Sequence, residues 1–90
     1  MASYRVAIKR TAAKEIESIT QKKVRRQLID RIGKLSANPR PLGCEKLSGQ
    51  HARYRIRQGR YRILYEIQDR ELVVFVVKVA HRREVYRNTH

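Results

Sequence analysis

The pattern of apolar and polar positions divides the chain into a helical half and a strand half. Residues 4–8 alternate between the two kinds, which predicts a short first strand. Residues 12–19 contain strong helix formers, and Thr11 precedes them as a candidate helix cap. A second helix is predicted over residues 22–37, where apolar residues recur at helical spacing. These residues are Val24, Leu28, Ile32 and Leu35. Asn38-Pro39 is expected to end this helix.

The second half of the chain has the two-residue period of β-strands. Residues 39–49 contain two prolines and two glycines and are predicted to form a loop. Three strands are predicted to follow, over residues 52–57, 60–67 and 71–79. Gln58-Gly59 is predicted to form the two-residue turn of a hairpin between the first two strands. The third strand is apolar on both faces, which is typical of a strand inside a sheet.

These elements predict an α+β fold in one domain that spans residues 1–90. An N-terminal strand and a two-helix hairpin come first, and a three-stranded antiparallel meander then completes a single sheet, followed by a short basic tail. A hydrophobic content of 41% is enough for one compact core. No run approaches the roughly 18 apolar residues that a membrane span needs, so no membrane partner is expected. The single Cys44 agrees with a cytoplasmic location, which we expect for this chain.

The charge of the chain is one-sided, with 22 lysine and arginine residues, 8 aspartate and glutamate residues, and a net charge of +14. Five arginines lie within ten residues of one another. They are Arg53, Arg55, Arg57, Arg60 and Arg62. Strand alternation places the first three on one face, and the predicted turn would set Arg57 opposite Arg60 and Arg55 opposite Arg62. Like charges placed opposite each other destabilise a sheet, so we expect the cluster to bind phosphate groups, which guanidinium contacts bidentately. Charge alone does not choose among RNA, DNA, anionic lipid and an acidic protein.

Three sequence stretches stand in an order and at a spacing that are found together in one family. They are KLSG at 46–49, YRIRQGRYRILYEI at 54–67 and HRREVYR at 81–87. With the predicted order of elements, they resemble the RelE/ParE family of bacterial and archaeal toxin-antitoxin toxins over nearly the whole chain. The chain is most similar to the RelE branch, whose members enter the ribosomal A site and cut messenger RNA. The ParE branch is similar in fold and poisons DNA gyrase.

The resemblance implies a catalytic set and a partner. Arg55 and Arg57 match two basic strand residues of RelE-type toxins, and Arg62 matches an arginine that contacts the scissile phosphate. Tyr86 matches a tyrosine that stacks on the nucleotide and takes part in catalysis. The implied partners are the ribosome with its messenger RNA and a cognate antitoxin, acidic or amphipathic, that covers the basic surface.

Further basic residues are expected around this set. Arg82 corresponds in the family to another phosphate-binding arginine, and Arg83 is the alternative for that role. Arg53, Arg60 and Arg87 are expected, with Arg83, to contact the RNA backbone.

The chemistry of RNA cleavage agrees with an arginine site. The 2′-hydroxyl must lose its proton and attack the adjacent phosphorus while negative charge builds on the phosphoryl oxygens, and fixed guanidinium groups stabilise that charge. The sequence has no histidine pair at helical spacing, no cysteine pair and no carboxylate cluster near the basic strands. We therefore expect a metal-free route through a 2′,3′-cyclic phosphate, with no cofactor.

Three residues are candidates for moving protons, because an arginine side chain stays protonated. His81 is one, since histidine exchanges protons near neutral pH, although it would equally suit a surface position that orients a loop. Tyr86 is the second, because surrounding guanidinium groups would lower its pKa; otherwise it would cover the core edge. Glu84 is a weaker third, with an ion pair to a neighbouring arginine as its alternative role.

Two classes of function remain open on this basis. One is a ribosome-dependent endoribonuclease, and the other is a non-enzymatic binder, either a ParE-like gyrase inhibitor or a small RNA-binding protein. The combination of Arg55, Arg57, Arg62 and Tyr86 favours the ribonuclease, because ParE-type chains usually lack the full set. A passive RNA binder would not need the tyrosine hydroxyl.

Overall fold

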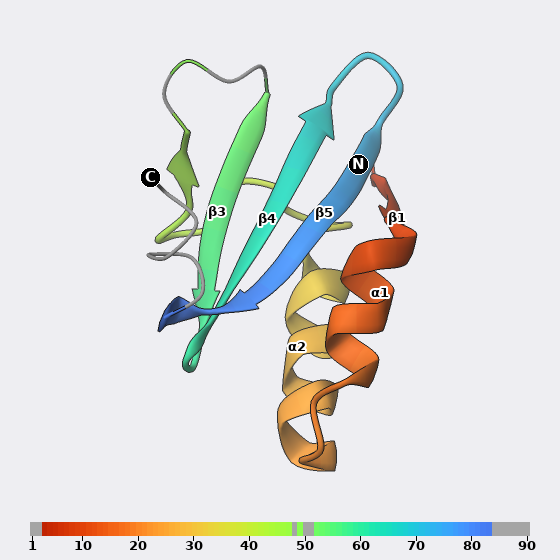
Figure 1. The fold of residues 1–90 in the computed structure, drawn as a ribbon. Helices are drawn as coiled ribbons and strands as arrows, with labels where there is room; N and C mark the ends of the chain where they lie inside the picture. The colour runs from red at the N-terminus through yellow and green to blue at the C-terminus, as the bar shows by residue number, and fades with distance from the viewer. Residues whose placement is uncertain (1–2, 48, 50–51, 84–90) are drawn as a thin grey trace.

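The fold is a single mixed β-sheet with two helices packed against one face (Figure 1). The computed structural model describes residues 3–47, 49 and 52–83. The elements are, in order, β1 (Arg5–Ile8), α1 (Arg10–Glu17), α2 (Lys22–Lys34), β2 (Glu45–Lys46), β3 (Arg53–Gln58), β4 (Tyr61–Gln68) and β5 (Val73–His81). The strand order is β1-β5-β4-β3-β2, with β1 parallel to β5 and the other pairs antiparallel. The predicted α+β fold and the interior position of the last strand are confirmed.

The hydrophobic core lies between the helices and one face of the sheet. The predicted helical stripe is confirmed, because Leu28, Ile32 and Leu35 are buried and Val24 packs against them. The sheet contributes side chains that alternate along each strand, as half-buried strands require. They are Tyr54 and Ile56 of β3, Ile63, Tyr65 and Ile67 of β4, and Val74, Val76 and Val79 of β5. Burying a side chain of this size contributes about 1.5–3 kcal/mol, so this face stabilises the sheet.

The helix boundaries differ from the prediction at two places. α1 begins at Arg10, so Thr11 lies inside its first turn and the predicted cap is wrong. Lys9 occupies the N-cap instead: its N–H donates to Val76 O at 2.8 Å as the last bond of β1 to β5, and its carbonyl accepts from Ala13 N at 2.9 Å. The chain therefore passes from strand to helix without a separate capping residue. α2 ends at Lys34, three residues earlier than predicted.

The register of the β3–β4 hairpin also differs from the prediction. Gly59 and Arg60 form the turn, Arg57 lies opposite Arg62, and Arg55 lies opposite Leu64. Gly59 has φ of +60°, which suits the first position of a type II′ turn, so the glycine sets a register that the predicted Gln58-Gly59 turn missed. The arginines still share a face as expected, but only one pair of them is directly opposed.

A short edge strand was not predicted. β2 lies within the predicted loop over residues 39–49 and pairs with β3, where Glu45 is opposite Arg55. Two residues are too few to show an alternating pattern, so only its position beside β3 identifies this strand. β5 also runs two residues later than predicted, from Val73 to His81, because the chain turns over residues 69–72.

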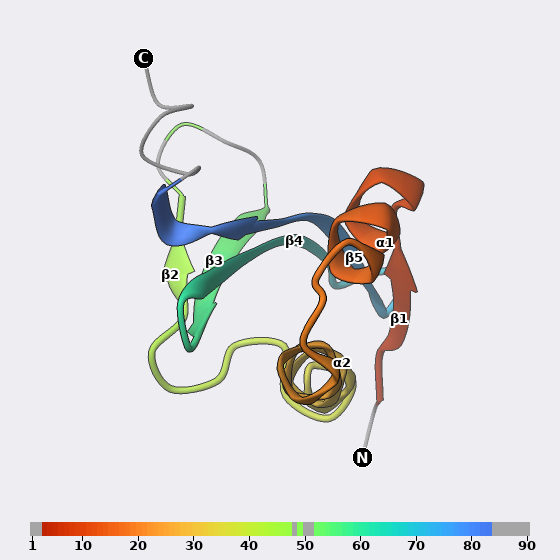
Figure 2. The same ribbon diagram turned by 60° about the horizontal axis from the view of Figure 1, so that its bottom comes forward.

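The loop between α2 and β2 is fastened to the sheet by an arginine–aspartate pair. Arg40 Nη2 donates to Asp69 Oδ2 at 2.8 Å and Nη1 donates to Oδ1 at 3.2 Å, while Tyr4 Oη donates to Oδ1 at 2.6 Å. Arg40 also lies over the Tyr54 ring, 5.2 Å from its centroid. The hydrogen bonds from Arg40 and then Tyr4 lower the pKa of Asp69 to about 2. This cluster holds the loop that Figure 2 shows running from α2 to β2.

The depressed pKa of Asp69 predicts a loss of stability in acid. The folded state binds a proton at Asp69 less readily than the unfolded chain, so the pair stabilises the fold fully above about pH 4 and loses its effect as the pH falls towards about 2. We expect the difference in free energy of unfolding between the wild type and Asp69→Asn to shrink across this range in urea titrations. Asp30→Asn, at an exposed position of α2, is the control. A difference that stays constant down to pH 2 would contradict the assignment.

Candidate functional site

Four arginines from separate parts of the chain meet in one hollow, which we call the arginine groove. It has a volume of about 430 Å³. Its lining residues are Arg31 of α2, Leu42 and Gly43 of the following loop, Glu45 of β2, Arg55 and Arg57 of β3, and Arg62 of β4. Four guanidinium groups thus face a single carboxylate, and the groove is strongly positive. Such a site suits a phosphate group, to which arginine donates two parallel hydrogen bonds.

The strand arginines reach the groove because of their register. Arg57 and Arg62 are directly opposite each other in an antiparallel pair, and Arg55 is two residues along β3 on the same face. The predicted gathering of Arg55, Arg57 and Arg62 is therefore found in the structure. Their roles in catalysis remain a prediction.

Arg31 is a groove residue that the sequence interpretation missed. It follows Leu28 by three residues and precedes Leu35 by four, so it lies on the inward-facing stripe of α2 rather than on its solvent face. Its side chain is half-buried. A charged residue at helical spacing within an apolar stripe was the signal that could have found it.

Two of the clustered arginines are neutralised by carboxylates of the same chain. Arg55 Nη2 contacts Glu45 Oε2 at 2.7 Å, and Arg53 Nε contacts Glu66 Oε2 at 2.9 Å. Arg53 does not line the groove. Glu45 is 66% exposed, and exposed ion pairs contribute only about 0–1 kcal/mol, so an incoming phosphate can replace it on Arg55. Of the five clustered arginines that we expected to bind phosphate, Arg53 and Arg55 are thus already paired with carboxylates of the chain itself.

Arg57 and Arg62 are the groove arginines best placed for a ligand. Within the described residues, neither forms an ion pair with a carboxylate. Arg62 is half-buried, and its Nη1 is inaccessible to solvent and has no hydrogen-bond acceptor among those residues. A buried donor without an acceptor costs about 1–3 kcal/mol, so a turn of the Arg62 side chain that lets Nη1 donate to a phosphate in the groove would relieve an existing penalty.

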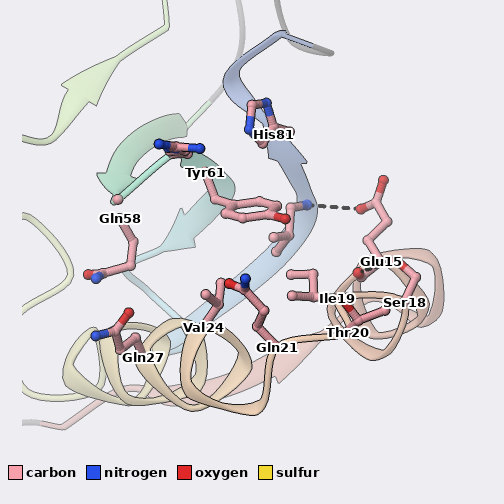
Figure 3. Close-up of a pocket in the computed structure, with 13 residues that line it drawn as sticks. Glu15, Ser18, Ile19, Thr20, Gln21, Val24, Gln27, Gln58, Tyr61 and His81 are labelled. Atoms are coloured by element: carbon pink, nitrogen blue, oxygen red, sulfur yellow. Dashed lines mark hydrogen bonds between the residues drawn. The ribbon is translucent and has the colours of Figure 1, made fainter.

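A second and larger hollow lies at the other side of the hairpin tip, and we call it the Tyr61 hollow (Figure 3). Its volume is about 920 Å³, and it is bounded by the α1–α2 corner, the residues of the hairpin tip and the end of β5. Tyr61 projects into it, and His81 meets the Tyr61 ring edge-on with centroids 5.4 Å apart.

The structure does not bring His81 together with the arginine groove. His81 is the last residue of β5 rather than a residue beyond it, and it pairs with Tyr61, whereas Arg62 pairs with Ala80. Adjacent residues of a strand point to opposite faces, so His81 and Arg62 lie on different sides of the sheet. The expectation of a shared site for these two residues is not met in the described structure.

Of the remaining predicted residues, the structure describes Arg60, Arg82 and Arg83. Arg60 is in the turn, and its carbonyl accepts from Arg82 N at 2.8 Å, which places these two residues side by side. Arg82 and Arg83 are both exposed, so the geometry does not choose between them. Glu84, Tyr86 and Arg87 lie outside the described residues.

Residues 3–47, 49 and 52–83 contain no cluster of three or more His, Cys, Asp or Glu side chains that could hold a metal ion. Neither α1 nor α2 is long and apolar enough to cross a membrane.

Known proteins resemble this chain along nearly its whole length. The model of the family described as the ParE toxin of the type II toxin-antitoxin system, parDE, matches residues 6–86. Toxin RelE of Mycobacterium tuberculosis is 31% identical over 84 residues, which cover 93% of this chain and 87% of the relative. Toxin RelG of the same organism is 27% identical, with 93% and 97% covered.

Solved structures resemble the chain in fold as well. The archaeal RelE–RelB complex from Pyrococcus horikoshii OT3 contains a chain with a TM-score of 0.79 and 28% identity, covering 89% of this chain and 96% of that one. The intact E. coli RelBE toxin–antitoxin complex gives a TM-score of 0.75 at 30% identity, covering 88% and 96%. The protein therefore belongs to the RelE/ParE superfamily and is a RelE-like toxin of a type II toxin-antitoxin system.

Proposed function

We propose that this toxin is a ribosome-dependent endoribonuclease that cuts messenger RNA in the A site and thereby inhibits translation in the cytoplasm. The observation that supports this most directly is the arginine groove. A scissile phosphate gains negative charge as it reacts, and Arg31, Arg57 and Arg62 are fixed around one hollow of suitable charge. Fixed donors aimed at developing charge are among the strongest contributions to catalysis.

The proposed reaction is an attack within the RNA strand. The phenolate of Tyr86, which nearby guanidinium groups favour, takes the proton of the 2′-hydroxyl, and the 2′-oxygen attacks the adjacent phosphorus. The bond to the 5′-oxygen breaks, water protonates the leaving oxygen, and a 2′,3′-cyclic phosphate remains. The hydroxide that is left takes the proton from Tyr86 and restores the phenolate. Arg57 and Arg62 stabilise the phosphoryl oxygens throughout. We assign the proton to Tyr86 because it matches the family's catalytic tyrosine in sequence, whereas His81 lies on the face of the sheet opposite the arginine groove. No metal ion is needed, since guanidinium groups supply the positive charge.

An antitoxin is the second proposed partner. Solved relatives include RelE–RelB and RelBE complexes, whose toxin chains share this fold. A net charge of +14 on 90 residues favours an acidic partner that covers the arginine groove and excludes RNA. Translation would then continue while the antitoxin occupies the groove and stop when messenger RNA occupies it.

Gyrase inhibition is the alternative function, and the match to the ParE toxin family model favours it. Induction of the toxin in cells separates the two functions. Mapping of messenger 5′ ends during translation reports the ribonuclease, and DNA supercoiling reports gyrase arrest.

Replacing Arg62 should abolish most messenger cleavage. Loss of one donor to transition-state charge lowers kcat by about 10²–10³-fold, so we expect Arg62→Gln to cut messenger in a translation extract at least 100-fold more slowly. Arg70→Gln, an exposed arginine outside the groove, is the matched control and should cut normally. Cleavage by Arg62→Gln at the wild-type rate would remove this arginine from the mechanism.

Arg31 should contribute a phosphate contact. For single-stranded RNA, each phosphate contact adds about 0.7 to the slope of log affinity against log salt concentration. We expect Arg31→Gln to weaken binding of a 2′-O-methylated RNA, which cannot be cut, and to reduce that slope by about 0.7. Arg26→Gln changes an exposed arginine of the same helix and is the comparison variant. Equal slopes for both variants would show that Arg31 makes no contact.

Tyr86→Phe tests the proton transfer, because it keeps the ring and removes the hydroxyl. General acid–base catalysis contributes typically 10²–10⁴-fold, so we expect a rate loss in that range with ribosome binding unchanged. His81→Asn should cut within a few-fold of the wild-type rate. The reverse ranking of the two variants would assign the proton to His81.

A further inference from the structure

We infer that the Tyr61 hollow binds an unpaired nucleobase of the same RNA strand whose phosphate lies in the arginine groove. This inference rests on the proposed function and adds a base-binding site to it. The hollow is separate from the groove, and its volume of about 920 Å³ is within the range of about 300–1,000 Å³ that is usual for small-ligand sites.

The lining of the hollow suits a base. Tyr61 offers a flat ring that is half-buried and braced by the edge of His81 at 5.4 Å, so it needs little ordering before a base stacks on it. Ile19, Val24 and Val79 supply an apolar floor. Figure 3 shows the side chains of Gln21, Gln27 and Gln58 around the same space. Amide groups both donate and accept hydrogen bonds, as recognition of a base edge requires.

Glu15, the one acidic residue that the described chain contributes to the lining, does not oppose an RNA ligand. Glu15 Oε2 accepts from Lys78 Nζ at 3.0 Å, and its Oε1 accepts from Val79 N at 2.9 Å. Both carboxylate oxygens are therefore occupied, and the negative charge is balanced within the protein. Besides Glu15 and His81, the lining contains one more ionisable side chain from the described residues, the guanidinium of Arg60.

The hairpin tip connects the two hollows. Residues 58–61 line the Tyr61 hollow, and the residues on either side of them, Arg57 and Arg62, line the arginine groove. Alternation along the strands sends these neighbours to opposite faces, so an RNA strand that crosses the tip can place a phosphate on one side and a base on the other. Arg60, in the turn, lies on the path between them.

A peptide segment of the antitoxin is the competing occupant, since an apolar floor with amide groups also suits a peptide. The RNA strand is favoured because residues 58–61, which line the hollow, are flanked in the chain by Arg57 and Arg62, which line a groove whose charge suits phosphate.

The test compares two probes of equal charge. One is a 2′-O-methylated RNA trinucleotide, and the other is the same ribose-phosphate backbone without bases. Stacking of one base contributes about 1–3 kcal/mol, or roughly 5- to 150-fold in affinity. We expect Tyr61→Leu to reduce the preference for the base-containing probe at least 5-fold while leaving the affinity for the bare backbone unchanged. Tyr61→Phe, which keeps the ring, should retain the preference.

A second variant covers the case in which Tyr61→Leu does not fold, because Tyr61 packs against the core. Gln58→Ala should reduce the same preference several-fold and change its dependence on base identity, whereas Gln68→Ala, at the exposed far end of β4, should not. An unchanged preference in Gln58→Ala and Tyr61→Leu would overturn the base site. Weaker antitoxin binding in those variants, with unchanged RNA preference, would assign the hollow to a peptide and also overturn it.

Binding of the base-free ribose-phosphate probe distinguishes failure of the base site from failure of the proposed function. If the wild-type protein binds the backbone and shows no preference for bases, the base site alone fails. If it binds neither probe, the arginine groove fails as well.

Discussion

The pairing of β3 with β4 is the constraint on which the rest of the molecule depends. In this register Ile56 is opposite Ile63 on the core face, and Arg57 is opposite Arg62 on the other. Because side chains alternate along a strand, a slip by one residue would place guanidinium groups in the core and expose the isoleucines. This register therefore determines which side chains form the core and which line the arginine groove. Because β4 has these two faces, His81, which pairs with Tyr61, lies away from the groove.

The core balances the electrostatic strain of this arrangement. Opposed cross-strand charges destabilise a sheet by an amount comparable to the roughly 0.2–1 kcal/mol of other cross-strand pairs, whereas burial of each isoleucine contributes about 1.5–3 kcal/mol. The neighbouring hydrophobic pair thus outweighs the repulsion between Arg57 and Arg62. Glu45 and Glu66 pair with Arg55 and Arg53, so among the arginines of β3 and β4 the opposed Arg57 and Arg62 are the ones without a carboxylate partner in the described part of the chain. A fold can hold unpaired positive charge ready for phosphate only where adjacent packing is this secure.

Sequence patterns correctly predicted the elements in which apolar side chains recur at a regular spacing. They failed for the hairpin turn, whose position depends on backbone angles. The stripe of α2 and the two faces of β3 and β4 were predictable because burial imposes the period. The turn was misplaced by one residue, since Gln58-Gly59 and Gly59-Arg60 both suit a hairpin. A type I′ turn at Gln58-Gly59 would need a positive φ at Gln58, and Leu72 is the one non-glycine residue of the described chain that has a positive φ. Arg31 was missed because the apolar stripe of α2 was interpreted only as core, although a charged residue at the same helical spacing marks this position. His81 was misassigned because β5 ends two residues later than its apolar run indicates.

The loop between α2 and β2 takes part both in stabilising the fold and in forming the arginine groove. Arg40 and Asp69 fasten it to the β4–β5 turn, and the same loop contributes Leu42 and Gly43 to the wall of the arginine groove and leads into Glu45. Leu42 is fully exposed, so burial of its side chain does not hold this part of the loop in place. The ion pair between Arg40 and Asp69 holds it instead. A polyanion that enters the groove therefore meets three arginines on strands and one on a helix, with the fastened loop as the remaining wall. Because separate elements of the fold hold these groups, the groove can keep one phosphate in a fixed position.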